Sequence, residues 1–338
     1  MNKFIMLCGL PASGKTTFAQ ELKYTNGEDK TVILSSDTIR EELFGERRQD
    51  KNGEVFDEMN RRTFENLEKG KNVIYDATNT NRKRRVALLK MLQAKFGYGC
   101  LYIVVGIINT PDRCRYTDSL REYKVGFDVI DKFAKTYEIP TYNEGWDQVI
   151  LRSNIPYATL DEVPKISSLL DRYNLVDYDT FINTLRSTYR HPSIQHFNYC
   201  IDMPQDSKYH TLSVSRHIYE VYKYMYLNYF GEYREEALLA SIFHDIGKPD
   251  CKRFDKKGEN AKYASYIGHD YASAQIAFVE MWRMLPYINK QTMRIVVDLI
   301  QFHMCFRSET LTERAKLYLG EDMFKVLEML HEADVQAR

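Results

Sequence analysis

The chain has 338 residues, of which 44% are hydrophobic, 28% charged and 13% aromatic. This length and composition are typical of a globular protein with room for two domains, each with its own core. Lysine plus arginine and aspartate plus glutamate both number 47, so the formal net charge is zero. A bulk electrostatic grip on long nucleic acid is thereby excluded, whereas a small contact with the end of a strand is not.

The hydrophobic residues and cysteines predict where the protein resides. No apolar run approaches the roughly eighteen residues of a membrane span, so no membrane partner is expected. The chain opens on an apolar strand with no cleavage-type signal behind it, and we expect a cytoplasmic protein. The six cysteines have no paired metal-binding spacing and are expected to be reduced; they are Cys8, Cys100, Cys114, Cys200, Cys251 and Cys305.

A short apolar strand, residues 3–8, runs into a glycine-rich loop at residues 9–17. Glycines in such a loop let successive backbone N–H groups point inward, Lys15 reaches the outer phosphates of a nucleotide, and Thr16 offers its hydroxyl to the bound Mg²⁺. The alternative is a glycine turn that holds no nucleotide, and the helical pattern at residues 17–22 argues against it. We therefore expect ATP or another nucleoside triphosphate with Mg²⁺. The residues expected to bind it are Gly9, Ser13, Gly14, Lys15, Thr16 and Thr17.

Strand-like and helix-like segments alternate over the first part of the chain. The expected strands are residues 31–37, 72–76, 100–108 and 148–151, and the expected helices are residues 38–44, 54–69, 82–96 and 112–123. Such alternation predicts a parallel sheet with helices on both faces, in which ligands bind at the carboxyl ends of the strands. Asp37, Asp76, Thr78 and Asn79 all follow such strand ends.

The pattern changes beyond about residue 139. Pro140, Pro156 and Pro164 interrupt it, and from residue 165 onward the periodicity is almost wholly helical. We therefore predict two domains, an α/β domain at residues 1–155 and an all-α domain at residues 165–338. The sequence contains no internal repeat, and it makes no prediction of the oligomeric state.

Asp37 and Arg40 lie one helical turn apart, after the second expected strand. Transfer of a phosphoryl group to an alcohol needs a carboxylate that accepts the hydroxyl proton and cations that neutralise the moving group, and this pair fits that need. The alternative is structural, because Ser36 or Asp37 could cap the helix, with Thr38 and Glu41 as a capping box.

Two cationic segments follow along the chain. Residues 82–85 add four cations to the loop that begins with Asp76, where an acceptor would enter. Residues 112–124 add further cations where a lid helix would close over the phosphates. Charged runs of this kind are usually solvated surfaces, which is the alternative for both.

Together these features resemble the P-loop 5′-OH polynucleotide kinases, over roughly residues 1–152. The matching motifs are Gly9 to Thr16, Ser36-Asp37-x-x-Arg40, Asp76-x-Thr78-Asn79 and the segment from Arg121 to Ile130. The resemblance implies that Asp37 is the general base for the 5′-hydroxyl, that Arg40 contacts the acceptor phosphate, and that Arg121 is a lid arginine on the donor phosphates. Lys15 completes the catalytic set.

The lid departs from the family's pattern at one position. The family usually carries another lid arginine about four residues before the first, where this sequence has Thr117. Arg113 and Arg115 are the nearest arginines that could take its place.

All eight histidines lie in the second part of the chain, between residues 191 and 331. His244 and Asp245 end an apolar helix at a turn. The further candidates, each on a separate expected helix, are His217, His269, His303 and Asp334. Imidazole and carboxylate groups that converge from separate helices bind divalent metal ions, which lower the pKa of bound water toward neutrality. The alternative for any one histidine is a hydrogen-bonded core residue.

The order of these residues resembles the HD phosphohydrolase superfamily, over roughly residues 165–338. That family is all-helical and metal-dependent, and it acts on phosphomonoesters, phosphodiesters or nucleotides. The resemblance implies one or two divalent transition metals, Mn²⁺ or similar, bound by His217, His244, Asp245 and Asp334 with His269 and His303 available for the second. It also implies that Lys248 meets a substrate phosphate and that His210 lines the pocket, whereas His191, His196 and His331 are structural.

The whole chain is similar to the bifunctional end-healing enzymes that join an HD phosphohydrolase to a polynucleotide kinase. This similarity implies ATP-dependent phosphorylation of the 5′-OH ends of RNA or DNA and removal of a 3′-phosphate or 2′,3′-cyclic phosphate, upstream of a polynucleotide ligase. Two alternatives stay open. One is a nucleoside or metabolite kinase fused to an HD nucleotidase, and the other is an inactive, nucleotide-dependent RNA-binding scaffold.

Overall fold

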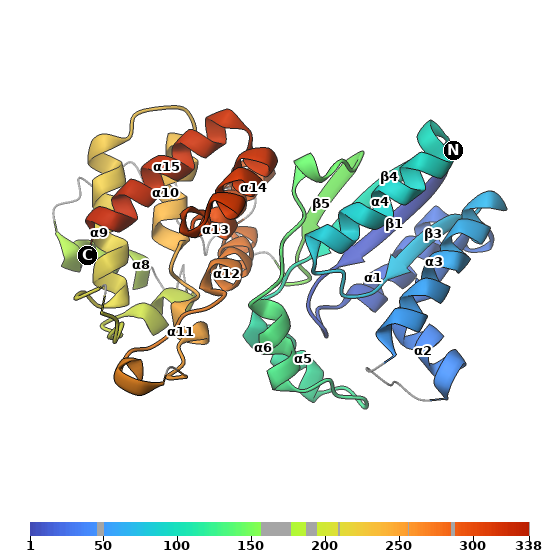
Figure 1. Ribbon diagram of the computed structural model, residues 1–338, viewed down its shortest axis with the longest axis horizontal. Helices are drawn as coiled ribbons and strands as arrows, with labels where there is room; N and C mark the ends of the chain where they lie inside the picture. Colours follow the sequence, from blue (N-terminus) through green and yellow to red (C-terminus); the bar gives the residue numbers. More distant parts are fainter. Residues whose placement is uncertain are drawn as a thin grey trace. The chain divides into compact units, whose positions relative to one another are not determined.

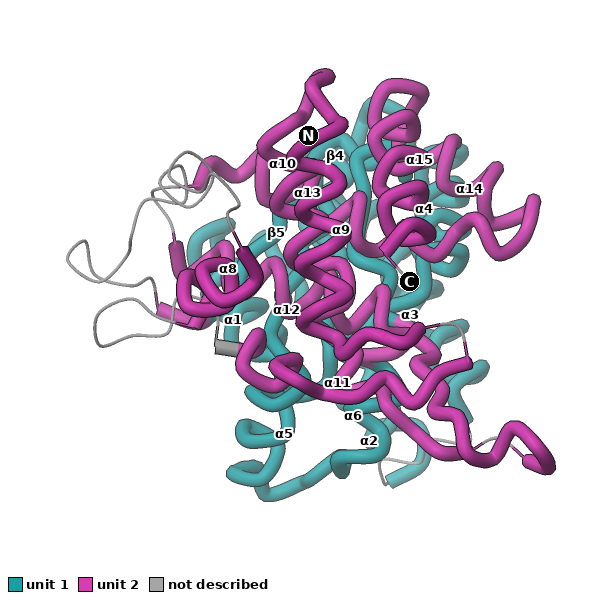
Figure 2. The backbone as a smooth tube through the Cα atoms, turned by 90° about the vertical axis from the view of Figure 1, so that its left-hand side faces the viewer, with its two compact units in different colours: residues 1–133, 137–154 teal, residues 134–136, 155–338 magenta. Residues whose placement is uncertain are grey.

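The computed structural model describes residues 1–45, 51–156, 177–186, 195–208, 210–255, 257–284 and 288–337. The chain divides into two compact units (Figure 2): unit 1 is Met1–Phe133 with Tyr137–Asn154, and unit 2 is Ala134–Thr136 with Ile155–Arg338. Residue 165, where the second domain is predicted to begin, and His191 lie outside the described residues. The assignment of the two predicted domains to families stays a prediction.

Unit 1 is built on a five-stranded parallel sheet (Figure 1) with the order β2-β3-β1-β4-β5. The strands are β1 Asn2–Cys8, β2 Thr31–Ser35, β3 Asn72–Asp76, β4 Cys100–Ile107 and β5 Gln148–Arg152. Their valine and isoleucine side chains favour strands because β-branched residues pack well on a pleated surface. Leu7 is in register with Asp76 of β3 and with Val105 of β4, so the carboxyl ends of the three central strands meet at one edge.

Helices cover both faces of this sheet. The helices of unit 1 are α1 Lys15–Asn26, α2 Ser36–Phe44, α3 Asn52–Glu68, α4 Arg82–Phe96, α5 Pro111–Ser119 and α6 Phe127–Ala134, with short 3₁₀ turns η1 Glu28–Lys30, η2 Gly97–Gly99 and η3 Tyr142–Glu144. Ile74 of β3 packs in one cluster with Ala19 of α1, whereas the hydroxyl of the next residue, Tyr75, donates to Asn60 of α3. Because successive strand residues point to opposite faces, α1 and α3 lie on opposite sides, and the predicted α/β fold is confirmed.

The helix expected at residues 112–123 ends earlier, at Ser119. The carboxylate of Asp118 accepts hydrogen bonds from the backbone N–H groups of Val125 (3.0 Å) and Gly126 (3.0 Å). These bonds turn the chain back on itself, because they compete with continuation of the helix. α5 and α6 are therefore two short helices joined by a fixed turn.

A buried ion cluster joins the start of α4 to residues 138–146. Arg85 donates two hydrogen bonds to the carboxylate of Glu144 (3.0 and 2.6 Å), and Arg82 donates a third (3.2 Å). Burial alone would raise the pKa of Glu144, but the two arginines outweigh burial and hold that pKa below its ordinary value. Arg82 and Arg85 are therefore buried in ion pairs, so neither one belongs to a solvated surface and neither charge is offered to an entering acceptor.

The ion cluster predicts that Glu144→Ala lowers the free energy of unfolding by a large amount. This change leaves Arg85 buried without its carboxylate, and breaking a buried pair in this way costs about 3–5 kcal/mol of unfolding free energy. The measurement is urea denaturation followed by circular dichroism. As a control, Glu21→Ala on the exposed side of α1 should cost less than about 0.5 kcal/mol, and equal small losses in both variants would contradict the argument.

The described elements of unit 2 are helices joined by loops, as predicted. Its helices are α8 Tyr178–Arg186, α9 Val214–Asn228, α10 Arg234–Phe243, α11 Lys248–Cys251, α12 His269–Arg283, α13 Lys290–Phe302, α14 Glu309–Leu319 and α15 Glu321–Gln336, with 3₁₀ turns η4 Gln195–Cys200, η5 Gly258–Asn260 and η6 Cys305–Arg307. α12 packs along α13, α10 packs against α9 and α13, and α15 packs against α9. These contacts bring the ends of several helices together around one centre.

Two further findings bear on the early expectations. All six cysteines are buried free thiols. Within the described ranges, none of the helices has the length and apolar character needed to cross a lipid bilayer.

Candidate functional site

The glycine-rich loop lies between β1 and α1, at the carboxyl edge of the sheet. Gly9 and Gly14 have φ angles of 155° and 92°, a region that favours glycine. A Cβ added at Gly9 would lie 2.4 Å from the backbone oxygen of Ile107. The carbonyl of Ser13 accepts a hydrogen bond from Asn109 (3.0 Å), which fixes the loop to the end of β4. The loop therefore depends on the close approach of its own backbone to that of β4 at Ile107.

Lys15 and Thr16 open α1 directly after the loop. The Lys15 ammonium is buried and donates to the carbonyls of Leu10 (2.6 Å) and Gly9 (3.1 Å). The Thr16 hydroxyl donates to Oδ2 of Asp76 (2.8 Å). Hydroxyl and carboxylate oxygens are ligands that Mg²⁺ accepts beside a nucleotide, so Thr16 and Asp76 fit a shared Mg²⁺ ion.

Asp76 is a site residue that the sequence analysis did not single out as a ligand. Its position at a strand end was visible, but its pairing with Thr16 depends on β3 lying next to β1. Burial raises the pKa of Asp76, and Lys15 opposes that rise. Burial likewise lowers the pKa of Lys15, whereas Asp76 and Asp37 act to raise it, so these charged groups share one site.

Asp37 lies in the first turn of α2, after β2. Its side chain is 47% exposed, whereas that of Arg40 is only 4% exposed. Arg40 donates to Asp37 (2.9 Å) and to Asn52 (2.7 Å), so it fixes the Asp37 carboxylate at the sheet edge. The capping alternative is wrong, because α2 begins at Ser36 with Ser35 in the cap position and no side-chain cap bond. The role of Asp37 as a base and the contact of Arg40 with an acceptor phosphate stay predictions.

The arginines predicted to form a lid lie in and just after α5. Arg121 has its Nη1 atom 3.6 Å from Oδ1 of Asp118. Arg115 is bonded to both Asp112 and Asp131, so its charge is already neutralised within the lid. Of the two possible replacements for the family's other lid arginine, Arg115 is therefore the less suited, and the contact of Arg121 with donor phosphates stays a prediction.

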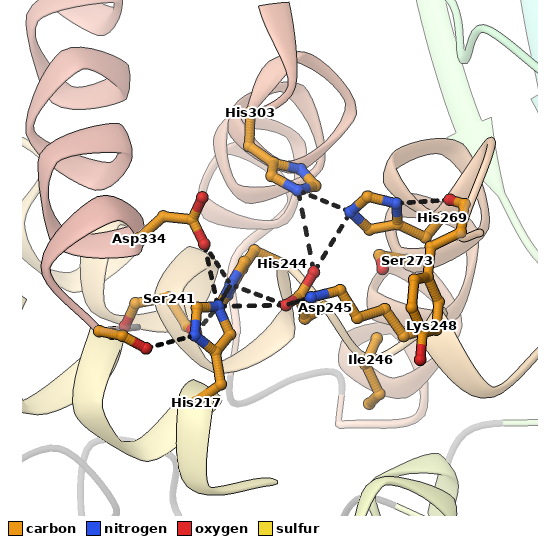
Figure 3. Close-up of polar contacts among 12 residues, drawn as sticks. His217, Ser241, His244, Asp245, Ile246, Lys248, His269, Ser273, His303 and Asp334 are labelled. Atoms are coloured by element: carbon orange, nitrogen blue, oxygen red, sulfur yellow. Dashed lines mark hydrogen bonds and ion pairs between the residues drawn. The ribbon is translucent and has the colours of Figure 1, made fainter. Parts of the chain in front are cut away.

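The six predicted metal ligands of unit 2 converge on one centre (Figure 3). His217 comes from α9, His244 and Asp245 from the turn after α10, His269 from the first turn of α12, His303 from the end of α13, and Asp334 from α15. Two groups have ligand atoms within 4.8 Å of one another: His217, His244, Asp245 and Asp334, and Asp245, His269 and His303. Asp245 belongs to both groups and therefore bridges them.

The turn that carries His244 and Asp245 is pressed against α12. The N–H of Gly247 donates to the Ser273 hydroxyl (2.9 Å), and a Cβ added at Gly247 would lie 2.6 Å from the backbone nitrogen of Ser273. Glycine is required here by the close approach of the two backbones. This contact fixes the distance between Asp245 and the histidine at the start of α12.

All four histidines are oriented in the same way. Their Nδ1 atoms lie 2.7–2.9 Å from backbone carbonyl oxygens: His217 with Ala337, His244 with Ser241, His269 with Tyr266 and His303 with Ile300. Because a carbonyl oxygen only accepts, Nδ1 carries the proton and Nε2 of a neutral ring keeps its lone pair.

The Nε2 atoms face one another in pairs. Those of His217 and His244 are 3.4 Å apart, and those of His269 and His303 are 3.2 Å apart. Two lone pairs at this separation repel unless a cation or a proton lies between them. Imidazole nitrogens with bridging carboxylate oxygens are the donor set that divalent transition metals prefer, so these residues fit one or two such ions.

The pKa values of His303 and His217 shift in opposite directions. Burial, helped by His269 and His244, lowers the pKa of His303 to about 3. Burial also acts to lower the pKa of His217, but its hydrogen bonds with Asp245 and Asp334 outweigh that effect and raise the pKa to about 9. A proton therefore occupies His217 at neutral pH until a metal ion displaces it.

Lys248 and His210 lie beside the centre. The Lys248 ammonium is 2.5 Å from Oδ2 of Asp245 and donates to Oε1 of Gln205 (2.7 Å). His210 packs edge-on against His217 with ring centroids 4.9 Å apart, and burial with the charge of Lys248 lowers its pKa to about 4. No motif in the sequence identifies Gln205 as a partner of Lys248.

Two other histidines lie outside this centre. His196 has Nδ1 2.8 Å from a carboxylate oxygen of Glu280, and the ring of His331 stacks on Phe306 with centroids 4.3 Å apart. Neither residue belongs to the two ligand groups found among the described residues. The structural role expected for both stays a prediction.

One protein family matches the first part of the chain. Residues 4–140 match the protein family described as "AAA domain". This match spans the glycine-rich loop, Thr16 and Asp76, and residues 4–140 are a P-loop, kinase-like nucleotide-binding domain, which implies ATP and Mg²⁺. No curated protein matches the chain.

A solved structure described as "Structure of Pnkp1/Rnl/Hen1 complex" has 24% sequence identity to this chain and a TM-score of 0.29. The similarity covers 38% of this chain and 44% of that one, so less than half of that protein's length is matched. A likeness this weak carries no argument about function.

The raised pKa of His217 predicts that metal binding to unit 2 strengthens with pH. Below about pH 9 a metal ion must displace the proton of His217, so the apparent affinity should rise about tenfold per pH unit between pH 6 and 8. Calorimetric titration of Mn²⁺ in buffers of different ionisation enthalpy measures both the affinity and the proton released. A control variant, His331→Ala, should leave both unchanged, and binding that is flat with pH and releases no proton would contradict the assignment.

Proposed function

We propose that the protein heals broken nucleic acid ends. Unit 1 would transfer a phosphoryl group from ATP to a 5′-hydroxyl, and unit 2 would remove a 3′-phosphate or open and remove a 2′,3′-cyclic phosphate. One observation carries the proposal for unit 1: the buried Arg40 fixes the half-exposed carboxylate of Asp37 beside a phosphate loop. The same chain also holds a histidine centre suited to a metal ion. A ligase needs the two ends that these reactions produce.

The residues of unit 1 support phosphoryl transfer to an alcohol. Asp37 is exposed enough to accept the proton of an incoming hydroxyl, and Arg40 keeps its carboxylate in place. Lys15 and Arg121 would neutralise the charge of the transferred group. Mg²⁺ held by Thr16 and Asp76 would supply further neutralisation on the donor phosphates.

The residues of unit 2 support hydrolysis of a phosphate ester. A divalent transition metal held by His217, His244, Asp245 and Asp334, with a second near His269 and His303, would lower the pKa of bound water and polarise the phosphate. The backbone carbonyls fix the histidine rings, so the ligands need little reorganisation. Lys248 is buried and ion-paired with Asp245, and its ammonium would bind a phosphate oxygen.

The deciding experiment uses a short RNA with a 5′-hydroxyl and a 2′,3′-cyclic phosphate, incubated with ATP, Mg²⁺ and Mn²⁺. Wild type should convert both ends. Lys15→Ala should abolish 5′ phosphorylation and spare the 3′ reaction, whereas Asp245→Ala should do the reverse. Gel separation of end-labelled products measures each reaction.

One outcome would replace this proposal with its main alternative. If neither RNA end changes while ATP or free nucleotides are consumed, the protein is a small-molecule kinase joined to a nucleotidase. Competition by a free nucleoside gives a further check, because an end-healing kinase should phosphorylate the oligonucleotide better.

A second prediction concerns the base. Asp37→Asn keeps the size of the side chain but removes the proton acceptor, so kcat for 5′ phosphorylation should fall by about 10²–10⁴-fold. Affinity for ATP, measured by calorimetry, should change little, because Lys15 and the loop are untouched. The matched control is Asp57→Asn on the exposed side of α3, and an equal loss of kcat in both variants would argue against a role for Asp37.

A further inference from the structure

One segment of unit 2 leaves the histidine centre and returns to it. Residues 252–267, here called the arm, begin directly after α11, which carries Lys248, and end two residues before His269. Figure 1 shows the arm as an orange loop that extends beyond α11. Its two sides pair once, because Arg253 and Ser265 exchange backbone hydrogen bonds of 3.1 and 2.8 Å.

The arm is strongly basic in a chain of zero net charge. It contains five lysines and arginines and only two acidic residues, an excess of three positive charges. It also contains three aromatic residues, namely Phe254, Tyr263 and Tyr266. Neither the positive charge nor the aromatic residues are needed to bind a metal ion, because the predicted metal ligands lie outside the arm.

The described part of the arm presents cations and apolar rings together to solvent. Phe254 is 59% exposed, and both Lys257 and Lys262 are exposed. The Lys262 ammonium lies 5.1 Å from the centre of the Tyr263 ring. The Lys252 ammonium lies 5.7 Å from the centre of the Phe254 ring and is ion-paired with Asp206 (2.6 Å), so the exposed lysines are the ones offered to a ligand. Alternating cations and aromatic rings are what a single-stranded nucleic acid needs, because phosphates bind the cations and bases stack on the rings.

Tyr266 connects the arm to the centre. Its carbonyl oxygen lies 2.7 Å from Nδ1 of His269, and its hydroxyl donates to the carbonyl of Gln205 (2.6 Å). Its ring lies 5.6 Å from the ammonium of Lys248. A nucleic acid strand that lies along the arm would therefore lead toward the residues proposed to act on its terminal phosphate.

We propose that the arm binds the single-stranded polynucleotide whose 3′ end enters the histidine centre. This inference rests on the proposed function and deepens it, because it names the surface of unit 2 that binds the strand behind its 3′ end. The contacts available are to phosphates and base faces, so binding should be strong at low salt and tolerant of base sequence.

The test compares two substrates in the full-length protein. One is a ten-nucleotide RNA with a 5′-phosphate and a 3′-phosphate, and the other is a nucleoside 3′-monophosphate, which has no further nucleotides to lie along the arm. The arm variant is Phe254→Ala with Lys257→Ala and Lys262→Ala. The matched control removes one exposed phenylalanine and two exposed lysines elsewhere in unit 2, as Phe230→Ala with Lys316→Ala and Lys325→Ala.

The arm variant should raise KM for the RNA by at least about tenfold, with no change for the mononucleotide. The slope of log affinity against log salt, measured by fluorescence anisotropy of labelled RNA, should fall by about 1.4, since two lysine contacts are lost. The control variant should match wild type in both assays. Unchanged thermal unfolding of both variants excludes a loss of folding as the cause.

Failure of the arm and failure of the proposed function give different results. If wild type hydrolyses both substrates and the arm variant binds and cleaves the RNA normally, the arm proposal is overturned and the hydrolase stands. If wild type hydrolyses neither substrate but the arm variant still weakens RNA binding, the arm stands and the hydrolase falls. Capture of anionic vesicles with no RNA binding would overturn the arm proposal in favour of a membrane surface.

Discussion

Unit 2 depends on keeping one buried carboxylate paired. Asp245 is 1% exposed, and burial on its own would raise its pKa. Lys248, His244 and His217 outweigh burial and hold that pKa well below its ordinary value. His244 and Lys248 come from the same turn as Asp245, whereas His217 comes from α9 and His269, 3.3 Å from Oδ1, comes from α12. The charge that a metal ion would use therefore also specifies how α9 and α12 meet the turn after α10. A buried charge left without such partners would be costly enough to unfold the region.

Unit 1 meets the opposite requirement, because its site must keep charge accessible. Its parallel register brings the ends of β1, β3 and β4 to one edge, and the buried pair Arg85 and Glu144 lies behind that edge, where it fixes α4. Asp37 stays half exposed in front. Arg85 lacks solvent and serves the fold, whereas the half-exposed Asp37 can meet a ligand.

Much of this architecture could be predicted from the sequence, and the exceptions have a common cause. The strands followed from runs of buried β-branched residues, and the phosphate loop followed from a local motif. The order of histidines and aspartates on separate helices pointed to the six residues that converge in unit 2, and their role as metal ligands stays a prediction. The pairing of Thr16 with Asp76 and the burial of Arg82 and Arg85 by Glu144 could not be predicted, because each joins residues far apart in the chain. Gln205 was missed for the same reason, since its contact with Lys248 depends on how loops of unit 2 meet.

The buried thiols have a consequence for how the protein would tolerate oxidants. Burial raises the pKa of Cys8, which directly precedes the phosphate loop, and that of Cys114 in α5 to about 12. At neutral pH the reactive thiolate is then on the order of one molecule in 10⁵ at each position. Sulfenylation and alkylation should be correspondingly slow. The nucleotide site of unit 1 would thereby stay intact under oxidative conditions.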